Sequence, residues 1–160
     1  MSGSHLAQLN IARARAPLDD PLLADFMAQL DAVNALAEST PGFVWRLKSD
    51  SGNATDIRAF DDPRMIVNMS VWESVDALFA FTYKTAHTKV MNRRKEWFEP
   101  LPGPHMVLWW ISAGALPTLD EAKQRLEYLA AHGPTTAAFT FKVRFPPPTD
   151  LAVKTAAFVC

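Results

Sequence analysis

The sequence of 160 residues lacks most of the features that mark the common functional classes. Its single cysteine is the last residue, Cys160, so we expect neither an internal disulfide nor a cysteine-based zinc site, as in a reducing compartment. No stretch approaches the roughly 18 apolar residues that cross a bilayer. The first residues lack the charged start and apolar core of a secretory signal. We therefore expect a cytoplasmic protein that does not bind membranes.

The sequence also lacks an excess of positive or negative charge. Lysine and arginine number 16 against 17 acidic residues, so the net charge of -1 provides no field that would attract nucleic acid. The one basic cluster, Arg93 to Lys95, precedes Glu96 and is interpreted as a solvated helix face. The sequence contains no phosphate-binding glycine loop, no GxSxG elbow and no HExxH motif. These absences argue against nucleotide binding, serine hydrolysis and zinc proteolysis.

The composition that remains is that of one globular domain. Hydrophobic residues make up 49% of the chain, enough for a proper core at this length. We expect the domain to span residues 1–145. The run Pro146-Pro-Pro148 then opens a proline-rich tail, residues 146–160.

Hydrophobic periodicity predicts alternating strands and helices. Ser74 and Thr118 are good helix N-caps, Gly133 is a good helix stop, and Asp50 to Asn53 is a turn cluster of the hairpin kind. In chain order we expect a strand at 5–11, a helix at 22–38, strands at 43–48 and 65–72, a helix from 75 to about 97 with a break near 82–85, a strand at 105–111 and a helix at 119–131.

This order, βαββαβ with an added helix, predicts an α+β fold with a ferredoxin-like antiparallel sheet and helices on one face. Large apolar side chains occur on both faces of the predicted strands. We therefore expect a second copy of the chain to cover the face without helices, which makes a homodimeric α+β barrel with a hollow between two sheets.

Alternation along the strands assigns side chains to the two faces. The more apolar set is expected to meet the helices and the mixed set to line the hollow. The first set is Ala7, Leu9, Ile11, Met65, Val67, Met69, Val71, Met106, Leu108 and Trp110. The second set is Gln8, Asn10, Ile66, Asn68, Ser70, Trp72, His105, Val107, Trp109 and Ile111.

The polar residues of the second set are candidate site residues, each with a structural alternative. Asn10 and Asn68 either face a ligand or are satisfied by a neighbouring strand or water. Trp109 either walls the pocket or belongs to the core or the dimer interface. His105 either serves the site or lies at the rim in solvent.

His87 lies on the predicted helix, in a stripe with Tyr83, Met91 and Arg94 that faces the sheet or its mouth. It is either a partly exposed histidine bonded to a neighbour, or a general base, or an axial ligand of a metal cofactor, since imidazole serves both purposes near neutral pH.

Several short segments of the chain are similar to those of an uncharacterised bacterial family of the dimeric α+β barrel superfamily, which also contains the antibiotic-biosynthesis monooxygenases. These segments are His5-Leu-Ala-Gln-Leu-Asn-Ile11, Pro41-Gly-Phe-Val-Trp-Arg46, Ser70-Val-Trp-Glu-Ser74, Thr85-Ala-His87, Glu96-Trp-Phe-Glu-Pro100 and Pro104-His-Met-Val-Leu-Trp-Trp110.

The resemblance implies two kinds of chemistry. Haem-degrading members of the superfamily carry a similar Ala-His whose histidine ligates iron, matched here by His87, and a functional asparagine, matched by Asn10. The chain departs from them at Phe81, where they carry a tryptophan, and by a shorter spacing from Trp72 to His87. Cofactor-free members instead use polar barrel residues to activate a phenolic substrate and oxygen.

Together these observations predict a monooxygenase-like enzyme without an organic cofactor, acting on an aromatic or polyketide-like compound. The alternatives are a haem protein with His87 as iron ligand, and a non-catalytic barrel that sequesters a hydrophobic metabolite. The expected catalytic residues are His87, Asn10, Asn68 and His105. The expected substrate-binding residues are Trp72, Phe81, Tyr83, Trp109 and Trp45.

Overall fold

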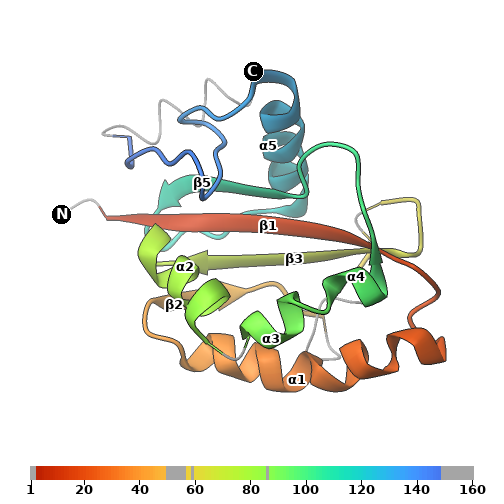
Figure 1. Cartoon of the computed structure of the whole chain (residues 1–160). Helices are drawn as coiled ribbons and strands as arrows, with labels where there is room; N and C mark the ends of the chain where they lie inside the picture. Colours follow the sequence, from red (N-terminus) through yellow and green to blue (C-terminus); the bar gives the residue numbers. More distant parts are fainter. Residues whose placement is uncertain (1–2, 50–56, 59, 86, 149–160) are drawn as a thin grey trace.

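The computed structural model describes residues 3–49, 57–58, 60–85 and 87–148. Its centre is an antiparallel sheet with helices on both sides (Figure 1). The strands are β1 (Ser4–Ala14), β2 (Phe43–Arg46), β3 (Met65–Trp72), β4 (Phe98–Glu99) and β5 (Met106–Ser112). The helices are η1 (Pro21–Leu23, a single 3-10 turn), α1 (Ala24–Ser39), α2 (Val75–Lys84), α3 (His87–Met91), α4 (Arg94–Trp97) and α5 (Leu119–His132).

The sheet has the strand order of a ferredoxin-like fold. β3 lies between β2 and β1, and β5 pairs with the other edge of β1, so the order is β2-β3-β1-β5. The short strand β4, which the sequence did not predict, extends the same edge by pairing with Arg13 and Ala14. All pairings are antiparallel. The predicted α+β architecture is confirmed.

Most helix ends lie where the sequence signals place them, but a second interruption, between the end of α3 at Met91 and the start of α4 at Arg94, was not predicted. The Oγ of Ser74 accepts a hydrogen bond from the N–H of Ala77, and Thr118 caps α5 in the same way. The predicted break near residues 82–85 is confirmed, because α2 ends at Lys84. There the hydroxyls of Thr82 and Thr85 donate to the carbonyls of Leu78 and Phe81, which offers the backbone an alternative to continuing the helix.

The assignment of sheet faces to helices is wrong for β1 and β3. α1, α2 and α4 pack on the face that carries Leu6, Gln8, Asn10, Asn68, Ser70 and Trp72. On β5, Leu108 and Trp110 do meet these helices as predicted, but they share a face with Trp72, whereas Trp109 shares the other face with Ala7 and Val71. Apolar content therefore did not indicate which face the first helices cover.

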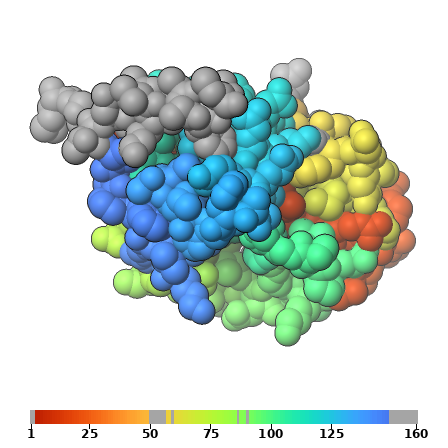
Figure 2. Space-filling model, turned by 90° about the horizontal axis from the view of Figure 1, so that it is seen from above, coloured from red at the N-terminus to blue at the C-terminus, as the bar shows by residue number. Residues whose placement is uncertain are grey.

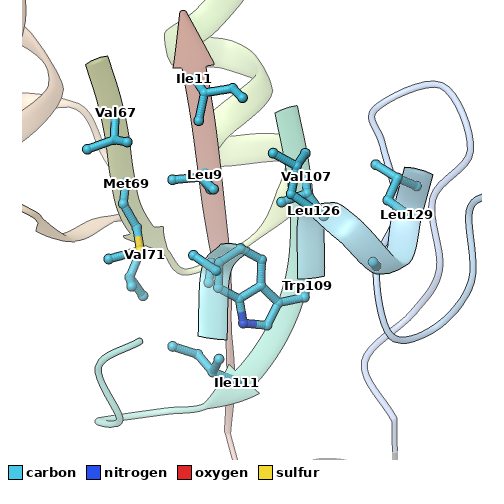
Figure 3. Packing of buried hydrophobic residues seen from close by; sticks show 13 residues of the cluster. Leu9, Ile11, Val67, Met69, Val71, Val107, Trp109, Ile111, Leu126 and Leu129 are labelled. Atoms are coloured by element: carbon cyan, nitrogen blue, oxygen red, sulfur yellow. The ribbon is translucent and has the colours of Figure 1, made fainter. Parts of the chain in front are cut away.

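The opposite face is covered by α5, not by a second copy of the chain. Leu126 and Leu129 of α5 pack with Val107 and Trp109 of β5 (Figure 3). Lys123 of α5 also lies over the ring of Phe60, which packs against the same cluster. As a result Leu9, Met69 and Val71 are 0–1% exposed within a single chain. The uncovered face on which the expected dimer was based does not exist in the described structure.

The segment after α5 also joins this layered arrangement. The backbones of Leu108 and Phe139 exchange two hydrogen bonds of 2.9 Å, and the indole N–H of Trp110 donates to the carbonyl of Phe145. In the view of Figure 2, residues of α5 and of this segment, in blue, form much of the visible surface. The expected turn at Asp50 to Asn53 and the terminal Cys160 lie outside the described residues.

Gly42 lies in the turn between the end of α1 and the start of β2. Its φ is +91°, which favours glycine, and a Cβ built on it would lie 2.5 Å from the Cβ of Ala77. The Gly42 carbonyl accepts a 2.7 Å hydrogen bond from the N–H of Glu73, at the start of the passage from β3 to α2. Gly42 thus allows the backbone of β2 to approach α2 closely.

We expect Gly42→Ala to destabilise the protein by more than the cost of the left-handed backbone alone, which is about 1–2 kcal/mol. The matched control is Gly114→Ala, since Gly114 also has φ +91° but has no atom within 4 Å of a built Cβ. Urea unfolding of both variants measures the two costs. Equal free energies of unfolding for the two variants would show that the contact with Ala77 carries no cost.

Candidate functional site

A cavity of about 260 Å³ lies between the sheet and the helices on its polar face. Its floor comes from β1, β3 and the start of β5, and its roof from α1, α2, α3 and α4. In Figure 1, α1 and α3 lie below the strands, and α2 overlaps the lower strands in this view. The cavity is therefore formed within one chain, in contrast to the predicted hollow between two copies.

A hydrogen-bonded polar cluster forms the floor. Gln8 and Ser70 are opposite each other in the pairing of β1 with β3, and Asn10 is opposite Asn68. The side-chain amide of Gln8 donates to the Oδ1 of Asn68 at 2.6 Å and to the Oγ of Ser70 at 2.8 Å. The indole N–H of Trp72 donates to the same Oγ at 2.8 Å.

This cluster presents hydrogen-bond donors to the cavity. Because Gln8 donates to the Oδ1 of Asn68, the side-chain nitrogen of Asn68 is the group left to face a ligand. Asn68 is exposed although it lies in the middle of β3, since the cavity opens above it. The Oγ of Ser70 already accepts two hydrogen bonds, which leaves its hydroxyl hydrogen free to donate. The floor therefore suits a ligand oxygen that accepts hydrogen bonds.

A stack of three rings forms one wall. Phe81 lies 5.3 Å from Trp72, centroid to centroid and at 26°, and 4.7 Å from the imidazole of His87. Trp72 is 1% exposed and Phe81 is 8% exposed, so both rings are held by the core on the side away from the cavity. The stack positions the imidazole beside an aromatic surface.

His87 is oriented by the break between α2 and α3. Its Nδ1 lies 3.2 Å from the carbonyl oxygen of Thr82. A carbonyl only accepts, so Nδ1 carries the hydrogen and Nε2 of the neutral ring is the basic atom. Burial lowers the pKa of His87 below its ordinary value of 6.5, and the Thr82 carbonyl raises it by less. The ring is therefore neutral at pH 7 and able to accept a proton.

His105 and Arg94 lie near the start of β5. Burial is the main cause that lowers the pKa of His105, and the positive charge of Arg94 lowers it further. The buried Nδ1 of His105 has no hydrogen-bond partner on another described residue. Asn10, directly opposite Met106 in the sheet, lines the same part of the cavity.

The structure brings most of the predicted site residues to one cavity. His87, Asn10, Asn68, His105, Trp72 and Phe81 line it, and Tyr83 lies at its rim with 45% of its surface exposed. Their roles in binding or catalysis stay predictions.

Two predicted wall residues do not line this cavity. Trp45 is opposite Val71 in the pairing of β2 with β3, and Trp109 is opposite Ala7 in that of β1 with β5. Both indoles therefore point to the face covered by α5, where they pack with its core cluster. Their assignment to the cavity wall is corrected accordingly: for Trp109 the core alternative holds.

Four further residues of the cavity were not among the expected catalytic and substrate-binding residues. Gln8 and Ser70 were placed on the polar face but not joined into a cluster, which requires the strand register. Thr82 acts through its backbone carbonyl, for which the sequence has no signal. Arg94 was interpreted both as part of a solvated basic cluster and as a member of the His87 stripe that faces the sheet or its mouth, and it lines the cavity. Its position seven residues after His87, two helical turns, is the signal that placed it in that stripe.

The cavity does not fit haem. Its volume of about 260 Å³ is below the roughly 300–1,000 Å³ of pockets that enclose drug-sized ligands, and an iron porphyrin is larger than those ligands. The ring of Phe81 lies beside the imidazole that would ligate iron, 4.7 Å away from centroid to centroid. Among the residues that the structure describes, no group of three or more His, Cys, Asp or Glu could hold a metal ion.

Comparison with protein families gives one match, over residues 5–155, to the family described as "Domain of unknown function (DUF3291)". The chain belongs to this family. The resemblance drawn from the sequence motifs is thereby confirmed, with most of the chain inside DUF3291. No curated protein matches the chain.

Solved structures similar to this DUF3291 chain include antibiotic-biosynthesis monooxygenase-like proteins. SnoaB of Streptomyces nogalater, a cofactor-independent oxygenase, is 16% identical with a TM-score of 0.44, over 70% of this chain and 95% of that chain. A Nitrosomonas europaea protein provisionally described as an antibiotic biosynthesis monooxygenase is also 16% identical with a TM-score of 0.44, over 72% and 93% of the chains. Such distant likeness says nothing of substrate or reaction.

We expect His87 to make the protein less stable in mild acid. Its pKa is lower in the folded than in the unfolded chain, so its contribution is complete above pH 6.5 and is lost as the pH falls below 6.5 toward the folded pKa. The free energy of unfolding should therefore fall between pH 7.5 and pH 5 by a smaller amount in His87→Gln than in the wild type. The two falls should differ by about 1.4 kcal/mol for each unit by which folding lowers the pKa of His87. His132→Gln, at the exposed end of α5, is the control. The same pH dependence in wild type and His87→Gln would contradict the buried neutral ring.

We also expect no specific haem binding. Haemin added to the purified protein should give the same Soret spectrum with the wild type and with His87→Ala. A Soret band that forms with the wild type and disappears in the variant would show that the cavity opens to admit a porphyrin.

Proposed function

We propose that this protein is a small oxygenase that converts an aromatic or polyketide-like compound in the described cavity without an organic cofactor. The observation that carries the proposal is a floor rich in hydrogen-bond donors within the same cavity as a neutral, oriented imidazole. Donors of this kind stabilise an oxygen on which negative charge develops, and the imidazole accepts a proton near neutral pH.

The substrate class follows from the shape and chemistry of the walls. Trp72 and Phe81 supply flat apolar surface, and Leu30 and Val33 of α1 add aliphatic surface to the same lining. A planar ring stacks on such surfaces, and its oxygen substituents reach the donors on the floor. The volume suits a compound of a few fused rings at most.

The proposed reaction oxidises a methylene carbon beside an aromatic ring to a carbonyl. His87 Nε2 removes one proton from that carbon, and Asn68 and Asn10 donate to the substrate oxygen that takes up the charge. The carbanion adds to dioxygen, and the resulting peroxide is protonated. Loss of the second C–H proton with hydroxide then leaves the carbonyl and one water. One dioxygen is consumed for each carbonyl formed, and the substrate supplies all the electrons.

Two further expectations from the sequence stay predictions. Cytoplasmic location is one of them; in the part of the chain that the structure describes, no helix is long and apolar enough to span a bilayer. The homodimer is the other. Because α5 covers the sheet face to which the partner was assigned, a second copy would need a different surface of the chain.

We expect the protein to consume oxygen with dithranol, a phenolic anthrone, and to form the corresponding anthraquinone. His87→Gln should lower kcat by about 10²-fold or more, as expected for loss of a general base, and Asn68→Ala should lower it by about 10²-fold, as expected for loss of one donor to an oxyanion. An oxygen electrode and quinone absorbance measure the two sides of the stoichiometry.

The matched control is Asn92→Ala, because Asn92 is exposed and does not line the cavity. Circular dichroism confirms that each variant is folded. Dye or substrate binding without turnover of any tested anthrone would instead indicate that the cavity only sequesters a hydrophobic metabolite. Turnover that is unchanged in both cavity variants would place the reaction elsewhere.

A further inference from the structure

The charged groups that line the cavity are all of one sign. Apart from the phenol of Tyr83 at the rim, its ionisable lining residues are Arg46, Arg94, His87 and His105, and no described lining residue carries a carboxylate. The whole chain has a net charge of -1, so this positive lining is a local property of the cavity. A cavity whose walls exclude part of the solvent strengthens such a field and favours an anionic ligand.

The two arginines differ in their partners. Arg46, toward the α1–β2 end, forms an ion pair with Glu38 at 2.9 Å, which offsets its charge. Arg93, the neighbour of Arg94, pairs with Asp25 and Glu96 outside the cavity. Arg94 is half-buried, and it forms no ion pair with the residues that the structure describes. Its guanidinium is therefore the cation in the cavity that a ligand can still pair with.

Arg94 lies among other donors. α4, which begins at Arg94, lies close to the end of β1, where the N–H of Arg15 donates to the carbonyl of Trp97 (Figure 1). His105 is near enough to feel the charge of Arg94, and its buried Nδ1 has no partner on another described residue. Asn10, with no hydrogen bond from its side chain to the described residues, lines the cavity beside them.

We propose that Arg94, with His105 and Asn10, forms an anion subsite that holds a carboxylate or an ionised phenol of a planar aromatic ligand. The inference rests on the proposed function and narrows its substrate class to aromatic compounds with an anionic oxygen substituent. Arginine suits this task because its planar guanidinium donates two parallel hydrogen bonds to a carboxylate. The ring then extends toward Phe81 and Trp72, and the opposite end reaches His87.

The test compares two ligands of the same shape that differ in charge, 1-naphthoate and 1-naphthamide. Binding is measured by quenching of tryptophan fluorescence, since Trp72 and Trp97 both line the cavity. We expect the wild type to bind the carboxylate at least about tenfold more tightly than the amide, the size of effect that one charge-assisted hydrogen bond provides. Added salt should reduce this preference because it screens the charge.

Variants assign the preference to Arg94. Arg94→Gln should bind the two ligands within about twofold of each other, and Arg94→Lys should retain part of the preference because it keeps the charge but not the planar fork. Lys95→Gln is the matched control, since Lys95 is the next residue of the same helix, is exposed and does not line the cavity. Its preference should equal that of the wild type.

The outcomes distinguish a failure of the anion subsite from a failure of the proposed function. Equal affinity of the wild type for both ligands, or a preference that survives Arg94→Gln in a folded variant, would overturn the anion subsite and leave the oxygenase proposal standing. Failure of both ligands to bind would overturn the subsite and also count against the cavity as a substrate site. Loss of dithranol turnover in His87→Gln with an unchanged naphthoate preference would support the two proposals independently.

Discussion

The pairing register of β1 with β3 is the constraint on which the site depends. It places Gln8 opposite Ser70 and Asn10 opposite Asn68, so four polar side chains point to one face. Side chains in a strand alternate, and a slip of β1 by one residue against β3 would turn Gln8 and Asn10 into the apolar cluster under α5, away from Ser70 and Asn68. The fully apolar opposite face, with Leu9 and Met69, resists that slip through the cost of exposing it. The core thus sets the geometry of the cavity floor.

Both faces of the sheet are buried by the chain itself. α1, α2 and α4 cover the polar face, and α5 with the segment around Phe60 covers the apolar one. The cavity lies on the polar face, where the short helices α2, α3 and α4 follow one another over polar side chains such as Gln8 and Asn68. The cavity is therefore lined by residues of a single chain.

Much of the fold followed from local sequence signals, and the errors concern long-range packing. Caps such as Ser74 and Thr118 act on their own helix, so the elements and their order could be predicted. Which face of the sheet a helix covers depends on the whole fold, and the more apolar face of β1 proved to belong to α5. The sequence placed His87 and Asn68 at the cavity they line, whereas it could not decide between cavity and core for Trp109 or between solvent and cavity for Arg94.

The interruption between α2 and α3 has a chemical consequence. In a continuous helix each carbonyl accepts a backbone N–H four residues ahead, but here the carbonyl of Thr82 accepts from the imidazole of His87. Many histidines that act as bases are oriented by a carboxylate, which also makes them more basic. A peptide dipole holds this ring without a full negative charge beside it, so the break between the two helices defines the tautomer of His87 and adds no carboxylate to the cavity.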